Sequence, residues 1–178
     1  GPIPADQPWN LSQLVVGAEG TLGLALDATI TLTPLPAATA VVVLHFHDLI
    51  ESLRPVPAIL EHQPSAVELL DEWIIAPART NAASRPFATF FEGDPQAVLI
   101  VEFQGDSPDH AADRARDFIR DMKQRRIAHA HVLRTDPTGI AHVWELRKLG
   151  VGIAPNVRGS RKPLDFVDDA AIPVQHLA

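Results

Sequence analysis

The order of strands and helices that the sequence predicts from residue 38 onward limits most strongly what this chain can fold into. Apolar stretches with strand-like alternation or many β-branched residues occupy residues 38–47, 65–71, 97–103 and 127–134. With the helical patterns between them, the order is strand, helix, strand, strand, helix, strand, helix. A β-α-β-β-α-β succession is typical of the ferredoxin-like split unit. The sequence therefore predicts an α+β fold, an antiparallel sheet with helices on one face.

Helix start signals between these strands support the same order. Asp48 is a plausible N-cap, but Pro55 and Pro57 conflict with one continuous helix, because an interior proline costs about 3 kcal/mol. We therefore expect a kink, or a helix that begins at Pro55. Ser107, followed by Pro108, predicts the start of a second helix. Residues 71–76 predict a helical turn, residues 77–95 a loop, and residues 137–149 a last helix.

Three glycines, Gly17, Gly20 and Gly23, lie within seven residues ahead of the split unit. Glycine admits positive φ and lets a ligand approach bare backbone N–H groups. The spacing differs from the dinucleotide fingerprint, and no long helix pattern follows it. From spacing alone, a tight turn joining two strands explains the glycines equally well. Residues 24–33 alternate weakly and predict a strand.

The letters around these glycines carry a resemblance to a known family. Residues 11–24 (LSQLVVGAEGTLGL) and 28–36 (ATITLTPLP) resemble the end of the flavin-binding domain in FAD-linked oxidases of the vanillyl-alcohol-oxidase type. The branch they most resemble holds the D-lactate, glycolate and D-2-hydroxyglutarate dehydrogenases. The resemblance implies FAD as cofactor and assigns it to Gly17, Ala18, Glu19, Gly20, Thr21 and Gly23. Ala18 stands where the family usually has serine, which removes one hydroxyl group that would bond the cofactor.

The same resemblance implies two domains. Residues 1–36 would be the C-terminal end of the FAD-binding domain, and residues 37–178 a ferredoxin-like cap domain over the substrate, truncated at its C-terminus. We therefore expect a fragment, inactive alone, whose partners are the remainder of the FAD-binding domain and a small hydroxy acid. A homodimer would be one way to cover the apolar surface that a fragment exposes.

A late helix carries the second part of the resemblance. Residues 142–148 (HVWELRK) match the family's x-x-W-x-x-R-x pattern, and Lys162 follows Arg147 by fifteen residues. The resemblance implies that Arg147 and Lys162 bind the substrate carboxylate beside the flavin. A guanidinium grips a carboxylate through two parallel N–H bonds, and a second cation adds charge. The alternatives are a surface salt bridge for Arg147, and Arg158 or Arg161 as the second cation.

Other acidic residues match the family pattern without a role in the chemistry. Glu68 and Asp71 match an A-x-E-x-x-D pattern, and we assign them structural hydrogen bonds. Asp168 and Asp169 precede Pro173 and are interpreted as helix caps, with support of Lys162 as the alternative. The sequence has no nucleophile elbow or phosphate loop. The family's general base belongs to a His-rich motif that would follow residue 178, so the catalytic residues stay unknown.

Four histidines form a separate candidate cluster. His45 and His47 lie on one predicted strand, and His129 and His131 on another. Alternation places each pair on one face, and the two strands are neighbours in the split unit, so the pairs could meet near Glu102. Such a set suits zinc or iron. A polar sheet face covered by another domain or by solvent is the simpler alternative, and we assign no metal ligands.

Composition excludes several function classes. The net charge of −7 argues against a nucleic-acid surface, and no apolar run is long enough to cross a bilayer. The absence of cysteine excludes disulfides and thiolate metal sites and suits a cytoplasmic protein. The alternative function is an independent ferredoxin-like binding or dimerisation module without catalysis. The glycine segment at residues 17–23 separates the two hypotheses, because a freestanding module has no need of it.

Overall fold

The structure, a computed structural model, describes residues 12–153 and 170–178. The chain separates into two compact units, Gly1–Leu35 and Pro36–Ala178, which are described in turn. No helix in the described ranges has the length and hydropathy needed to cross a bilayer.

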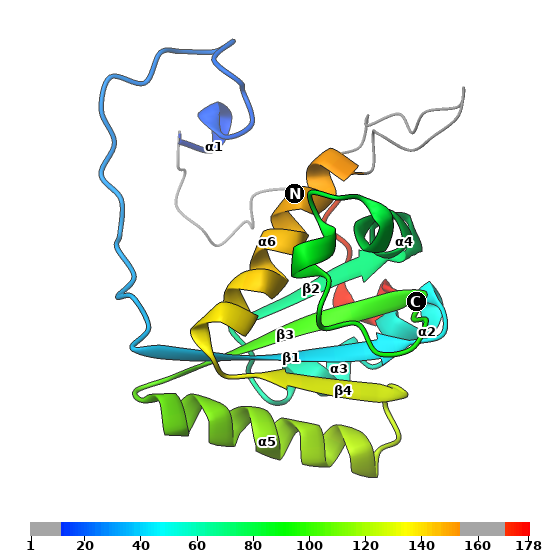
Figure 1. The fold of residues 1–178 in the computed structure, drawn as a ribbon. Coiled ribbons are helices and arrows are strands. Elements are labelled where there is room, and N and C mark those ends of the chain that lie inside the picture. The colour runs from blue at the N-terminus through cyan, green and yellow to red at the C-terminus, as the bar shows by residue number, and fades with distance from the viewer. Residues whose placement is uncertain (1–11, 154–169) are drawn as a thin grey trace, which may run out of the picture. The chain divides into compact units, whose positions relative to one another are not determined.

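The second unit is built on a four-stranded sheet (Figure 1). Its strands are β1 (Ala38–Phe46), β2 (Ala66–Asp71), β3 (Ala97–Gly105) and β4 (Ala130–Arg134), in the order β2-β3-β1-β4. Every neighbouring pair is antiparallel, and β1 pairs with β3 along its whole length. This is the strand order of the split unit. The predicted α+β fold with an antiparallel sheet is confirmed.

One face of the sheet packs against α3 (Val56–Leu60) and α5 (Pro108–Gln124). Even-numbered residues of β1 supply the strand side of this core, because alternate side chains share a face. α2 (Leu49–Leu53) begins after Asp48, whose carboxylate accepts the Glu51 N–H at 2.7 Å. Pro55 then separates α2 from α3 and is the N-cap residue of α3, which confirms the interruption predicted there.

The opposite face is also covered by helices, a feature that the prediction of helices on one face left out. α4 (Glu72–Thr80) and α6 (Pro137–Ile153) pack against the odd-numbered residues of β1, on the side of the sheet away from α5 (Figure 1). The reason lies in β1, which is buried at every position from Ala40 to Phe46. A strand with two apolar faces needs cover on both. The apolar run could have signalled this.

α4 also corrects the predicted loop at residues 77–95. The helix continues through Pro77 to Thr80, and a short 3-10 helix, η1 (Arg85–Phe87), follows. The Asp71 side chain caps α4 by accepting the Trp73 N–H at 3.1 Å. Ile75 and Ala78 are buried against the sheet. Their burial favours the helix over the break that proline introduces.

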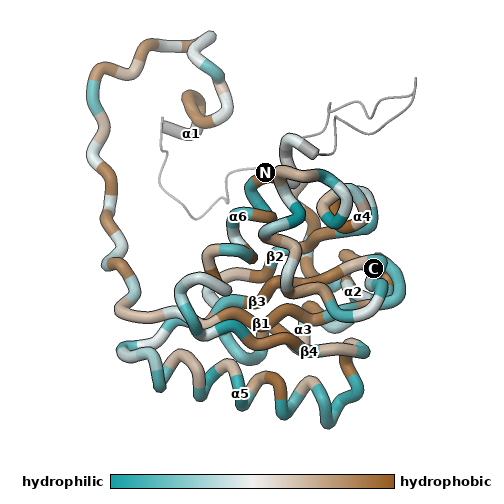
Figure 2. Tube along the Cα trace, in the orientation of Figure 1, coloured by the Kyte–Doolittle hydropathy of each residue, from teal (hydrophilic) through white to brown (hydrophobic). Residues whose placement is uncertain are grey.

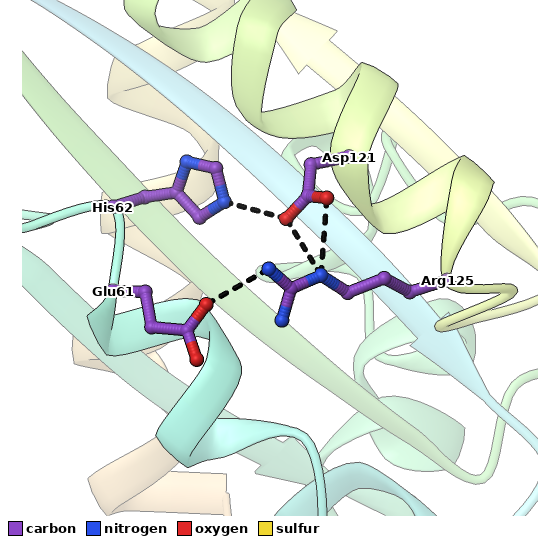
Figure 3. Close-up of polar contacts among 4 residues, drawn as sticks. All are labelled: Glu61, His62, Asp121 and Arg125. Atoms are coloured by element: carbon purple, nitrogen blue, oxygen red, sulfur yellow. Dashed lines mark hydrogen bonds and ion pairs between the residues drawn. The ribbon is translucent and has the colours of Figure 1, made fainter.

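A polar network joins the end of α3 to α5 on the first face. His62 Nε2 lies 2.8 Å from Asp121 Oδ2, and Arg125 bonds both Asp121 and, at 2.8 Å, Glu61 (Figure 3). The hydrogen bond from His62 holds the pKa of Asp121 below its usual value, and Arg125 adds to this effect. The loop after α3 is therefore fixed to α5 by charge as well as by packing.

Gly105, at the end of β3, lies against the backbone of α5. A Cβ atom there would lie 2.5 Å from the Ala111 nitrogen and 3.0 Å from its Cα. Because backbone atoms cannot rotate away, we expect Gly105→Ala to lower the free energy of unfolding by about 1–3 kcal/mol, measured by urea titration. Gly152→Ala, where a Cβ would meet no atom of the described part of the chain within 4 Å, is the control. Equal stability of the two variants would contradict the close approach.

The first unit holds a short helix, α1 (Ser12–Val15), followed by a turn and an extended segment. The strand predicted at residues 24–33 is not formed, since the sheet of the second unit contains all four strands of the described chain. A strand needs a hydrogen-bonding edge as well as an alternating sequence. Leu24, Leu26 and Leu32 are 80–89% exposed. Apolar residues recur along this extended segment (Figure 2).

Candidate functional site

α6 carries the matched tryptophan and arginine on one side of the helix. Val143 and Leu146 are fully buried against the sheet and fix the rotation of α6. Trp144 and Arg147 lie three residues apart, a spacing that places them on neighbouring turns of the same side. Both reach acidic residues of the sheet.

Arg147 forms an ion pair with Glu68 of β2. Its Nε and Nη2 atoms each donate to the same carboxylate oxygen, Oε2, at 3.1 Å. The arginine side chain is 40% exposed and the glutamate side chain 35%. Glu68 occupies only one edge of the guanidinium, and Nη1 donates no hydrogen bond to any residue that the structure describes. With respect to the described residues, the pair therefore leaves N–H groups available to a further anion.

Trp144 forms a second link from α6 to the sheet. Its indole Nε1 donates to Glu102 Oε2 at 3.1 Å, and Ser65 Oγ donates to the other carboxylate oxygen at 2.9 Å. The two carboxylates share a face, because Glu102 pairs with Ala66 and Glu68 with Ile100 in the β2–β3 ladder. α6 is thus fastened to two adjacent strands.

The partnership of Glu68 with Arg147 was missed in the sequence, although a signal was present. Glu68 and Glu102 each interrupt an otherwise apolar strand (AVELLD and AVLIVEF). A carboxylate on a half-buried strand needs a compensating donor. Sequence alone does not say which donor it finds, because the partners lie far apart along the chain.

The histidine cluster forms only in part. The rings of His47 and His129 stack with centroids 4.2 Å apart, and His45 meets His129 edge-on at 6.2 Å. His131 instead pairs with Leu44, on the opposite face from His45, and its Nε2 lies 2.8 Å from the Ile127 carbonyl oxygen. The expectation that the two pairs could meet is therefore wrong for His131.

The alternation fails because of the backbone ahead of β4. Ala128 has a φ of 67°, which breaks the pleat before His129, and β4 begins only at Ala130. Glu102 is also absent from the cluster, since it pairs with Val41 while His45 pairs with Val98. In the part of the chain that the structure describes, no three His, Asp or Glu side chains are arranged to hold a metal ion.

His45 is a fully buried titratable group. Its Nε2 accepts the Glu92 N–H at 3.2 Å and lies 3.2 Å from the Phe90 carbonyl oxygen, while Nδ1 has no hydrogen-bond partner among the described residues. Burial lowers the pKa of His45, and also lowers the pKa values of His129 and His131. Burial therefore disfavours the protonated form of all three histidines in the folded state.

We expect the stability of this domain to fall as the pH drops below 6.5. A histidine with a lowered folded pKa takes up its proton first in the unfolded chain. The stabilisation that each histidine contributes is complete above its pKa in the unfolded chain. It is lost as the pH falls toward its pKa in the folded state, by at most about 1.4 kcal/mol per pH unit and site. Urea midpoints at pH 7.5 and 5.0 measure this slope. His45→Gln should reduce the dependence of stability on pH, whereas His176→Gln, at an exposed position, should not. Equal pH dependence in the two variants would contradict the role of His45 burial.

The remaining predicted site residues divide into two groups. Lys162, Arg158, Arg161, Asp168 and Asp169 lie outside the described residues. The glycine segment is described and forms a turn in the first unit, with φ of 79° at Gly17, 48° at Glu19 and 77° at Gly20. The Thr21 N–H and hydroxyl both donate to the Ala18 carbonyl oxygen, at 2.8 and 2.6 Å.

The turn fits a flat cofactor that lies against the backbone. A Cβ atom at Gly17, Gly20 or Gly23 would meet no atom of the described residues within 4 Å, so toward these residues the glycine edges are open. Leu14, Val16 and Leu22, around the turn, are 60–79% exposed. Open backbone beside apolar side chains suits the stacking of a ring system together with N–H contacts to polar groups.

An open groove of about 510 Å³ lies elsewhere, along α4. Trp73, Arg79, Thr80 and Gln96 are among its lining residues, and Trp73 is 60% exposed. None of the predicted site residues within the described chain lines this groove. The groove is therefore separate from the arginine of α6.

Comparison with known proteins gives consistent similarities. Residues 35–178 match the family model described as FAD linked oxidases, C-terminal domain. The chain is 28% identical over 176 residues to D-2-hydroxyglutarate dehydrogenase of Pseudomonas putida, covering 96% of this chain and 18% of that protein. It is 32% identical over 183 residues to the Pantoea ananatis enzyme of the same name, covering 97% and 18%.

A mitochondrial protein shows a similar likeness. D-2-hydroxyglutarate dehydrogenase of Bos taurus is 27% identical over 143 residues, which is 79% of this chain and 26% of that protein. The chain thus spans less than a fifth of the length of the bacterial relatives and about a quarter of this one.

Proposed function

Because the chain belongs to the FAD linked oxidases, with residues 35–178 matching their C-terminal domain, we propose that it is part of an FAD-dependent oxidoreductase acting on a 2-hydroxy acid. The family match confirms the resemblance stated from the sequence. Within the proposed enzyme, residues 1–36 end the FAD-binding domain, and residues 37–178 form the cap. This chain supplies cap and substrate contacts, and the remainder of the FAD-binding domain is its partner.

The observation that carries the proposal is the half-exposed Arg147, in a domain of this family, with a guanidinium edge that no residue in ranges 12–153 and 170–178 occupies. A guanidinium edge donates two parallel N–H bonds to a carboxylate. Holding the acid group fixes the α-carbon and its hydrogen in one place. Part of the entropy lost on the way to the transition state is then already lost when the substrate binds, which lowers the activation barrier. Lys162, assigned by resemblance, adds a second positive charge to the same carboxylate.

The glycine turn at residues 17–23 provides the cofactor contacts in this proposal, through Gly17, Ala18, Glu19, Gly20, Thr21 and Gly23. Its open backbone supports that assignment. FAD, when bound, supplies the acceptor for the hydride of the substrate. We assign no catalytic base within this chain.

The proposed substrate class is a D-2-hydroxy acid. Similar proteins carry the names D-2-hydroxyglutarate dehydrogenase and D-lactate dehydrogenase. These substrates share a carboxylate next to a secondary alcohol, and the Arg147 edge binds the shared carboxylate. The group beyond the α-carbon, which separates a diacid from a monoacid, requires contacts other than Arg147.

Anaerobic flavin reduction tests this function. The FAD-loaded flavoprotein that contains this domain is mixed with D-2-hydroxyglutarate or D-lactate, and the flavin absorbance is followed. We expect bleaching with at least one D-acid and none with the corresponding L-acid. An FAD-loaded protein that stays oxidised with every 2-hydroxy acid would contradict the proposal and favour a binding module without catalysis.

A further inference from the structure

The contact between Arg147 and Glu68 is asymmetric. A guanidinium has a side edge, formed by Nε and Nη2, and an end edge, formed by Nη1 and Nη2. Glu68 receives both N–H groups of the side edge on one oxygen, Oε2, at 3.1 Å each. The end edge keeps two parallel N–H groups, the arrangement that a second carboxylate requires.

The sheet fixes the direction of this free edge. Glu68 is held in the β2–β3 ladder, where it pairs with Ile100, a fully buried residue. One turn away on α6, the Trp144 indole is held by Glu102, whose second oxygen accepts the Ser65 hydroxyl. The contacts of Arg147 and Trp144 with the sheet restrict both the rotation of α6 about its axis and its movement along that axis. The long arginine side chain is thereby confined at its helix end and at its guanidinium.

The ion pair also changes what Arg147 contributes. Glu68 largely neutralises the guanidinium charge, so the pair attracts an anion less than a free arginine would. The ion-paired Arg147 therefore orients the substrate carboxylate, while net positive charge has to come from another cation. A second basic residue close to the substrate carboxylate is what such a pair needs.

We propose that Glu68 is a positioning residue, which holds the side edge of Arg147 so that the end edge receives the substrate carboxylate. This inference rests on the proposed function of Arg147. Its opposite is a gate, in which the substrate displaces Glu68 and the two carboxylates compete for one guanidinium. The two arrangements predict opposite effects when Glu68 is removed.

Kinetics of Glu68 variants in the FAD-loaded enzyme distinguish them. With D-2-hydroxyglutarate as the probe, positioning predicts that Glu68→Ala lowers kcat/KM by about 10- to 100-fold, since a misplaced binding group loses orientation. Glu68→Gln keeps an oxygen acceptor at the same reach and should recover part of the loss. A gate predicts a lower KM in both variants. Glu145→Gln is the matched control, because it removes a carboxylate of α6 that pairs with Lys148 and leaves Arg147 untouched.

A spectroscopic readout is independent of activity. In ¹H–¹⁵N spectra, the Arg147 Nε–H of the wild-type protein should give a resolved signal in slow exchange with water, assigned by its loss in Arg147→Lys. Glu68→Ala should broaden or remove that signal, and Glu145→Gln should leave it unchanged. Thermal melting of each variant separates these effects from unfolding.

The outcomes separate the inference from the function on which it rests. If Arg147→Met binds and oxidises the probe as the wild type does, the function proposed for Arg147 fails. If Arg147→Met is impaired while Glu68→Ala matches Glu145→Gln in kinetics and spectrum, only the positioning role is overturned. A lowered KM in Glu68→Ala overturns it as well and establishes the gate.

Discussion

Replacing Arg147 with methionine should lower kcat/KM for a D-2-hydroxy acid by about 10²–10⁴-fold. Two charge-assisted hydrogen bonds to the substrate carboxylate are lost, and such bonds contribute about 1.5–3 kcal/mol each. Arg147→Lys keeps the charge but loses the planar pair of donors, so it should recover only part of the activity. Steady-state kinetics on the FAD-loaded enzyme measure both variants.

The matched control for this change is Arg79→Met. Arg79 also forms an exposed ion pair, with Asp94 at 3.0 Å, but it lies on α4 and not on α6. Partly exposed ion pairs contribute about 0–1 kcal/mol to stability, so neither variant should unfold at the assay temperature. Similar kinetics for Arg147→Met and Arg79→Met would mean that Arg147 is a surface salt-bridge residue only.

Replacing Phe118 with alanine should lower the free energy of unfolding by about 3–5 kcal/mol. Phe118 is completely buried between α5 and the sheet, with its ring 5.0 Å from the Phe103 ring and 5.2 Å from the His62 ring. The truncation leaves a cavity that fixed backbone on both sides cannot close. This is the largest stability effect that we expect. Because domains are stable by only about 5–15 kcal/mol, the loss is a substantial part of the free energy of unfolding. Urea titration at pH 7.5 measures it.

Two further variants calibrate this result. Phe118→Leu retains most of the buried volume and should lose less than Phe118→Ala. Trp73→Ala removes a larger ring that is 60% exposed, and it should change stability little. If Trp73→Ala destabilised the domain as much as Phe118→Ala, the packing of α5 would not be what holds this face of the sheet.

Much of the fold could be predicted because local signals agree with the tertiary structure. Asp48 and Ser107 cap helices where the sequence placed them, and Pro55 interrupts the first helix as expected. The succession of elements then leaves few topologies for the sheet. The coverage of the second face was missed, because the helix signals of α4 and α6 do not say which face of the sheet each helix packs against.

The candidate site was less accessible from the sequence. Arg147 was found through a resemblance, whereas its partner Glu68 depends on the register between β2 and β3 and on the rotation of α6. The histidine prediction failed for a comparable reason, since the register pairs His131 with Leu44, on the face opposite His45, while His129 lies before β4, after the positive φ of Ala128. Alternate residues share one face of a sheet only within a continuous strand.

The central position of β1 has a consequence for how this protein is made. β1 is buried on both faces, and both of its edges are paired, yet β3 and β4 come much later in the chain. During translation, its apolar segment leaves the ribosome before either neighbouring strand exists. The sheet therefore closes only after β4 has been synthesised, through pairings distant in sequence, which fold slowly and leave an unpaired strand open to aggregation. In the nascent chain, β1 is therefore a segment that chaperone binding would protect from aggregation.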